Sequence, residues 1–140
     1  MRNRESSIGT ASCCAMIEPR FLLDTNILVY LIGGASARLR GRVEEHEPGR
    51  VVTSTLCVAE AMYGIAVNGQ SASLAALLKV IEPMPFDRAA AERFPGVPFR
   101  RGKLDRFIAA HALALDLTLV TNDESDFADI PGLAIENWTR

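Results

Sequence analysis

The chain has 140 residues, the usual size of one domain, and its 49% hydrophobic, 23% charged and 6% aromatic residues match an average globular protein. This balance excludes a disordered chain, a coiled coil and a collagen-like protein. Lys and Arg number 15 against 17 Asp and Glu, so the net charge of -2 excludes a uniformly basic nucleic-acid coat protein, and any nucleic-acid site must be local.

In chain order, short apolar runs alternate with helical patterns. We expect strands at residues 21–23, 51–53, 80–84, 117–120 and 133–135. We expect the helices between them at residues 27–32, 38–47, 55–67, 71–79, 87–94 and 104–115. Ser54 or Thr55 is placed to cap the helix that follows the second strand. Because helical segments separate the strands, their connections are crossovers, and we expect an α/β fold with a mostly parallel sheet of four to five strands covered on both faces.

The ends of the chain and its cysteines bear on location. Residues 1–18 are small, polar and aperiodic, so we interpret them as a flexible tail in which Met16 is an alternative start, and we assign residues 19–140 to one domain. The first 20 residues lack the apolar centre of a signal peptide, the low-charge stretch 51–78 is too polar for a membrane span, and the three cysteines form no disulfide or zinc pattern. We expect a soluble, cytoplasmic protein with no membrane contact.

Acidic residues stand where parallel sheets bind their ligands, beyond the carboxyl ends of the strands. Asp24 directly follows the first strand, and Asp123 follows the fourth. Asp105 begins the helix that runs antiparallel to the fourth strand, so it returns to the same edge, and its spacing from Ile108 turns it towards the sheet. Glu60 is the only charged residue over 51–78, and a carboxylate in apolar surroundings needs a partner, a proton or a cation.

Each acid also has an ordinary structural explanation. Asp24 could cap a helix, Asp105 could complement a helix dipole, Asp123 could belong to a turn and Glu60 could face solvent. Carboxylates gathered at one edge repel one another unless a cation neutralises them, so the four together predict a metal site on which they converge. Oxygen ligands without an available histidine favour Mg²⁺ or Mn²⁺, and such an ion supports phosphodiester hydrolysis.

Two further groups of residues are candidates for supporting roles. Small polar residues beside the acids could hold water or orient the carboxylates; these are Asn26, Ser54 and Thr121. Residues 88–106 carry six basic side chains against two acidic ones, so part of this stretch could contact an RNA backbone, although a solvated surface explains the same charges equally well. The candidates for RNA contact are Arg100, Arg101, Lys103 and Arg106.

Four pieces of the sequence, in this order, resemble the PIN-domain ribonucleases, and in particular the VapC toxins of bacterial toxin–antitoxin pairs. They are FLLDTNILVYL, TSTLCVAEAMYGI, KLDRFIAAHALALDLTLVTND and DFADIPGLAIENW, which span nearly everything from Phe21 to Trp138. The resemblance implies that the catalytic and metal-binding acids are Asp24, Glu60, Asp105 and Asp123. By the same resemblance, Thr121 matches the small hydroxyl residue before the fourth acid and has a supporting role. Asp126 lies nearby and could serve as an alternate or supporting acid.

The same resemblance implies a PIN-like three-layer α/β/α sandwich for residues 19–140 and Mg²⁺- or Mn²⁺-dependent endoribonuclease activity on RNA. A VapB-like antitoxin that blocks the site and a homodimer are the implied partners. Two features depart from the family pattern: Pro95 to Pro98 shorten the passage before Asp105, and the tail before Phe21 is long. A catalytically silent PIN-like module that binds RNA or protein is the alternative. A phosphohydrolase or receiver-like domain fits less well, because Asp24 has no second Asp two residues later.

Overall fold

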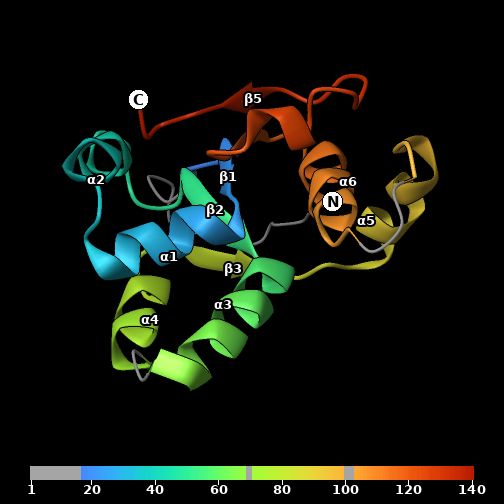
Figure 1. Cartoon of the computed structure of the whole chain (residues 1–140). Coiled ribbons are helices and arrows are strands. Elements are labelled where there is room, and N and C mark those ends of the chain that lie inside the picture. The colour runs from blue at the N-terminus through green and yellow to red at the C-terminus, as the bar shows by residue number, and fades with distance from the viewer. Residues whose placement is uncertain (1–16, 69–70, 100–102) are drawn as a thin grey trace, which may run out of the picture.

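The structure is a computed structural model that describes residues 17–68, 71–99 and 103–140. Its centre is a sheet of five strands in which every pair of neighbours runs parallel (Figure 1). The strands are β1 (Phe21–Leu23), β2 (Val51–Ser54), β3 (Glu82–Met84), β4 (Thr118–Val120) and β5 (Ile135–Glu136). Their order across the sheet is β3-β2-β1-β4-β5. The predicted parallel sheet of four to five strands is confirmed.

Helices cover both faces of this sheet. The described helices are α1 (Thr25–Gly33), α2 (Ala37–Glu44), α3 (Thr55–Asn68), α4 (Ser71–Leu78), α5 (Arg88–Arg93), α6 (Asp105–Leu115) and the 3-10 turns η3 (Phe94–Gly96) and η4 (Glu124–Asp126). Helices α1, α3 and α4 contact one another, and α5 packs along α6. The two groups lie on opposite sides of the sheet in Figure 1, as right-handed crossovers in opposite directions require. The predicted α/β/α sandwich is confirmed.

The direction of the chain across the sheet reverses after β3, and this reversal determines where a ligand can bind. The chain crosses back so that β4 pairs with β1 on the side opposite β2. The register pairs Leu23 with Val120, so Asp24 and Thr121, which follow them, lie side by side at the carboxyl edge. A reversal of this kind opens a crevice at the ends of the two strands, which is the usual ligand site of an open parallel sheet.

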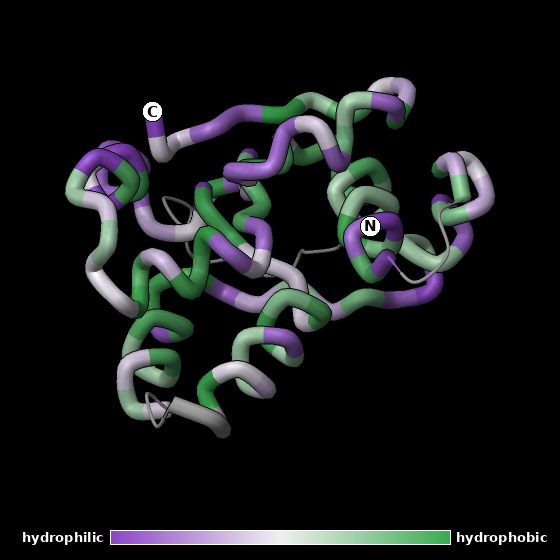
Figure 2. Tube along the Cα trace, viewed as in Figure 1, coloured by the Kyte–Doolittle hydropathy of each residue, from purple (hydrophilic) through white to green (hydrophobic). Residues whose placement is uncertain are grey.

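Apolar strands hold the layers together. The side chains of Leu22, Leu23 and Leu119 are fully buried, and each such side chain contributes roughly 1.5–3 kcal/mol to stability relative to an exposed position. Figure 2 shows hydrophobic stretches in the middle of the molecule, whereas α2 and the C-terminal end are among the most hydrophilic. None of the described helices has the length and apolar character needed to cross a membrane.

The last residues of the chain return to the sheet through Trp138. Its side chain is 0% exposed, and its indole Nε1 donates a hydrogen bond of 2.8 Å to Glu136 Oε1. The ring lies 5.0 Å from the Phe21 ring and stacks on His46 at 5.2 Å. His46, which the sequence places among surface charges, is therefore partly buried, because the tail after β5 covers it.

The boundaries of several elements differ from the predicted ones by one to three residues. β3 covers residues 82–84 and β5 covers 135–136, and both strands begin two residues later than expected. These two strands lie at the edges of the sheet, where one neighbour defines the pairing, so the apolar pattern alone marks their ends poorly. The predicted tail and the alternative start at Met16 fall outside the described residues, apart from residues 17 and 18.

Trp138→Ala should lower the free energy of unfolding by about 3–5 kcal/mol, because it empties a fully buried site and frees the tail after β5. Urea unfolding followed by circular dichroism measures this change. Tryptophan fluorescence does not serve, because the chain has one Trp and the variant has none. Trp138→Phe keeps a ring against Phe21 and should cost clearly less. A loss below about 1 kcal/mol in the alanine variant would contradict a structural role for this contact.

Candidate active site

Asp24 is both a helix cap and a buried acid. It is the N-cap of α1, and its Oδ1 accepts a hydrogen bond of 2.8 Å from the backbone N–H of Thr25. Its Oδ2 accepts a hydrogen bond of 3.0 Å from Thr121 Oγ1, and its own N–H donates to Val120 O at 2.9 Å. Only 7% of the residue is exposed. The structural and functional explanations of Asp24 are therefore compatible, because one carboxylate serves in both.

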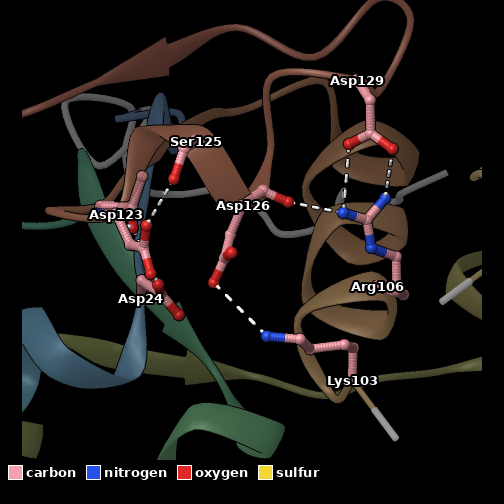
Figure 3. Close-up of polar contacts among 8 residues, drawn as sticks. Asp24, Lys103, Arg106, Asp123, Ser125, Asp126 and Asp129 are labelled. Atoms are coloured by element: carbon pink, nitrogen blue, oxygen red, sulfur yellow. Dashed lines mark hydrogen bonds and ion pairs between the residues drawn. The ribbon is translucent and has the colours of Figure 1, made fainter. Parts of the chain in front are cut away.

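Thr121 connects this buried acid to an exposed one. Its hydroxyl donates to Asp24 and accepts a hydrogen bond of 3.1 Å from the backbone N–H of Asp123. The carboxylate of Asp123 accepts a hydrogen bond of 3.1 Å from Ser125 Oγ. Figure 3 shows the side chains of Asp24 and Asp123 together at the end of β1. The carboxyl edge thus brings together two acids that are far apart in the sequence.

Glu60 reaches the site from α3, which packs on α1. The residue is exposed, and its Oε1 accepts a hydrogen bond from the hydroxyl of Thr25, the first residue of α1. The sequence predicts that this isolated carboxylate needs a partner but does not identify Thr25. The sequence did contain a sign of this partner, because Thr25 places a hydroxyl donor directly after Asp24.

Asp105 lies at the start of α6 and is partly buried. Its neighbour is Asp126 on η4, whose carboxylate oxygen Oδ2 lies 3.8 Å from Lys103 Nζ (Figure 3). Burial raises the pKa of Asp105, and the nearby Asp126 carboxyl and the charge of Glu60 raise it further, whereas Lys103 lowers it. Asp126 therefore lies beside Asp105, and its role in the site stays a prediction.

The pKa shifts show that the acids act on one another. Burial raises the pKa of Asp24 from 3.8 to about 6, and the charges of Asp105 and Glu60 add to this rise. Hydrogen bonds from Thr25 and Thr121 act in the opposite direction. Carboxylates affect one another in this way only when they are near neighbours in surroundings that exclude much of the water.

The expected convergence on one point is not met. Among residues 17–68, 71–99 and 103–140, no three Asp, Glu, His or Cys side chains lie in position to bind one ion. Mutual repulsion favours separated carboxylates, and the hydroxyl of Thr25 binds the Glu60 carboxylate. The chemistry of the donors still fits Mg²⁺ or Mn²⁺, because the four predicted acids all offer carboxylate oxygens, and a divalent cation would offset the burial and the repulsion that raise the pKa of Asp24.

The other supporting candidates have local roles. Ser54 Oγ accepts a hydrogen bond of 3.1 Å from the N–H of Leu56, which confirms it as a cap of α3. The same oxygen lies 2.9 Å from Nδ1 of His111 on α6. His111 is buried, and this burial lowers its pKa. Asn26 is exposed in the first turn of α1. Sequence reasoning missed His111, although its spacing of three residues from Ile108 places it on the buried face of α6.

The basic candidates divide into three cases. Lys103 is exposed, so it remains a candidate for RNA contact. Arg100 and Arg101 lie outside the described residues and stay a prediction. The expectation for Arg106 is wrong: 1% of the residue is exposed, and its guanidinium forms an ion pair with Asp129. Counting charges over 88–106 could not distinguish this buried side chain from an exposed one.

Comparison with known proteins identifies the family. The PIN domain profile matches residues 21–133, which is most of the chain. The chain belongs to the PIN domain family. It is 28% identical over 131 residues to the tRNA(fMet)-specific endonuclease VapC of Shigella flexneri, covering 86% of this chain and 98% of that protein. It is also 28% identical over 132 residues to ribonuclease VapC2 of Rickettsia felis, again covering 86% and 98%.

Solved structures agree with this assignment of the PIN domain. VapBC2 from Rickettsia felis, bound to a DNA fragment from its promoter, has a TM-score of 0.77 at 28% identity, covering 84% of this chain and 98% of that one. DNA-bound VapBC from Salmonella typhimurium has a TM-score of 0.74 at 28% identity, covering 86% and 98%. The chain is thus a PIN domain protein related to the VapC ribonuclease toxins of VapBC systems.

The pKa of Asp24 gives a pH dependence with a definite sign. The folded protein holds the proton up to about pH 6 and the unfolded chain only to 3.8, so folding becomes less favourable as the pH rises through this range. Above it the loss amounts to about 2–3 kcal/mol. In chelator at about pH 8, Asp24→Asn should therefore raise the free energy of unfolding by about 1–3 kcal/mol, because Asn is neutral and still caps α1.

Urea unfolding of both proteins in chelator, repeated from about pH 3 to pH 8, measures this effect. The difference should shrink as the pH falls towards the unfolded value of 3.8 and disappear near pH 3, where Asp24 is neutral in both states. Added Mg²⁺ should stabilise the unsubstituted protein more than the variant, because a ligand that binds the folded state stabilises it. A variant that is less stable than the unsubstituted protein in chelator at pH 8 would show that burial and neighbouring charges do not disfavour the ionised form of Asp24.

Proposed function

We propose that this protein is a Mg²⁺- or Mn²⁺-dependent endoribonuclease and the toxin of a type II toxin–antitoxin pair. The observation that carries the proposal is the group of carboxylates at the reversal point of a parallel sheet, where repulsion from Asp105 and Glu60 contributes to raising the pKa of Asp24. A group of carboxylates of this kind suits a divalent cation and, through it, a phosphodiester. The relationship to VapC ribonucleases supports the choice of RNA as substrate.

In this proposal Asp24, Glu60, Asp105 and Asp123 hold the cation directly or through water. When bound, the ion would polarise the phosphodiester and lower the pKa of a water for in-line attack, which leaves a 5′ phosphate and a 3′ hydroxyl. Thr121 orients Asp24, and Thr25 orients Glu60, through the hydrogen bonds described above.

The remaining residues have supporting roles. Ser54 fixes the start of α3, which carries Glu60, and Asp126 adds a carboxylate beside Asp105. Asn26, exposed in the first turn of α1, is close enough in sequence to Asp24 to hold water near it. Lys103 is exposed beside Asp126, where its ammonium group can contact a phosphate of the RNA backbone.

Partners follow from the relatives. Their solved structures include toxin–antitoxin complexes, such as VapBC2 from Rickettsia felis and a complex from Klebsiella pneumoniae. These complexes support our proposal of a VapB-like antitoxin that blocks the acidic site. The homodimeric state and the cytoplasmic location are proposed from the sequence and its family resemblance. A catalytically silent PIN-like module remains the competing function, and the separation of the carboxylates among the described residues is the observation that favours it.

Asp24→Asn and Asp105→Asn should each reduce Mn²⁺-dependent cleavage of RNA on the order of 100-fold or more, the scale on which a group that stabilises charge in a transition state contributes. Asp116→Asn is the matched control, because Asp116 is the exposed C-cap at the other end of α6. It has a φ of 58°, which Asn tolerates well. The control should cleave RNA at the rate of the unsubstituted protein.

Cleavage is measured on total RNA by mapping the cut ends, with Mn²⁺ and with chelator. Full activity in both variants would eliminate the mechanism. Binding of RNA without any cleavage in Mn²⁺ would support the silent module instead. Circular dichroism of each variant establishes that loss of activity is not loss of fold.

The purified protein should have a mass in solution of twice 15.2 kDa, as a homodimer requires. Light scattering coupled to size exclusion measures this mass independently of shape. Dilution over a hundredfold range tests whether the association is stable. A mass of 15.2 kDa at every concentration would remove the homodimer from the proposal.

A further inference from the structure

Arg106 makes several contacts that join three separate parts of the chain. Its Nη2 donates to the backbone carbonyl of Asp126 at 2.5 Å and to Asp129 Oδ1 at 3.1 Å. Its Nη1 donates to Pro98 O at 3.2 Å and to Asp129 Oδ2 at 3.4 Å. Figure 3 shows the guanidinium between α6 and the loop that follows β4. Two nitrogens of one side chain thus fasten this loop to the helix.

The fastened loop carries acids of the candidate site. Arg106 is the residue directly after Asp105, so one turn of α6 holds both an acid of the site and the side chain that binds the loop. The bonded carbonyl belongs to Asp126, whose carboxyl acts on Asp105. Earlier in the same loop, Thr121 fixes Asp123 at the end of β4. The loop is therefore held at two points: Thr121 binds the backbone of Asp123, and Arg106 binds the backbone of Asp126.

A contribution to stability alone is a poor explanation for this arrangement. A buried guanidinium loses its hydration, and well-packed apolar residues often replace a buried ion pair without loss of stability. The Nε of Arg106 is buried and has no hydrogen-bond partner among the described residues, which adds to the cost. What an apolar side chain could not reproduce is the directed bond to the Asp126 carbonyl.

We propose that Arg106 is a positioning residue that holds Asp126 against Asp105, so that these two carboxylates together form one side of the cation site. The inference rests on the proposed function, since it assigns Arg106 a task in the same site. Arg106 touches neither RNA nor the cation. It acts through the backbone of Asp126, and its effect is on the affinity for the ion.

The test replaces the ion pair by apolar side chains of similar length. Arg106→Met with Asp129→Leu removes the bonds to Asp126 and Pro98 but leaves no unpaired charge buried. We expect the double variant to unfold at a temperature close to that of the unsubstituted protein and to bind Mn²⁺ at least tenfold more weakly by calorimetry, the usual result of losing a partner that orients a ligand. Hydrogen exchange in chelator should be faster at the amides of Asp126 and Phe127, which lie in the released loop.

Two further variants make the result decisive. Arg88→Met with Glu92→Leu removes the same two charges from an exposed ion pair on α5 and should bind Mn²⁺ normally. Asp129→Asn keeps the shape of a side chain that is 38% exposed, so it should fold even where the double variant does not, and it should weaken Mn²⁺ binding by a smaller factor.

The outcomes separate this inference from the proposed function. Unchanged Mn²⁺ affinity in the folded double variant, or in Asp129→Asn where that variant is the one that folds, would overturn the role of Arg106 while the unsubstituted protein still binds the ion. No Mn²⁺ uptake by the unsubstituted protein would overturn both. Weaker binding together with faster exchange at Asp126, against a normal control, is the result expected of a positioning residue.

Discussion

The burial of one carboxylate beside other acids is the constraint on which the candidate site depends. Asp24 cannot turn away, because its oxygens cap α1 and accept a hydrogen bond from Thr121. Burial raises its pKa most, and Asp105 and Glu60 add their charges. A protein that retains such an arrangement either loses stability near neutral pH or gains it back from a bound cation, so the strain itself points to the ligand.

The starts of three helices lie at or near the candidate acids. Asp24 starts α1, Ser54 caps α3, which carries Glu60, and Asp105 is the first residue of α6. Crossover connections bring helix starts to the carboxyl edge of a parallel sheet, so capping residues and site residues come from the same positions. This overlap explains why Asp24 and Asp105 each have both a structural and a functional explanation in the sequence.

Local patterns predicted the parts of the fold that local chemistry determines. The run that forms β1 is apolar and stops at an Asp, so its limits were clear, and the direction of α6 sufficed to bring Asp105 to the correct edge. The Thr25 partner of Glu60 depends on how α1 packs on α3, which no spacing within one helix encodes. The burial of Arg106 depends on the loop at residues 126–129, which packs over its side chain. Counting the charges of residues 88–106 therefore wrongly placed Arg106 on the surface.

The loop after β4 connects the two halves of the site. Asp123 near its start is bound to Thr121 beside Asp24, and Asp126 further on is bound through its carbonyl to Arg106 beside Asp105. The two anchors belong to different layers, the sheet and α6. The separation between the acids therefore depends on how α6 lies on the sheet. Under the proposed function, residues that hold the acids in place, such as Thr121 and Arg106, would influence the affinity for the cation, as the hydrogen-bond partners of metal ligands usually do.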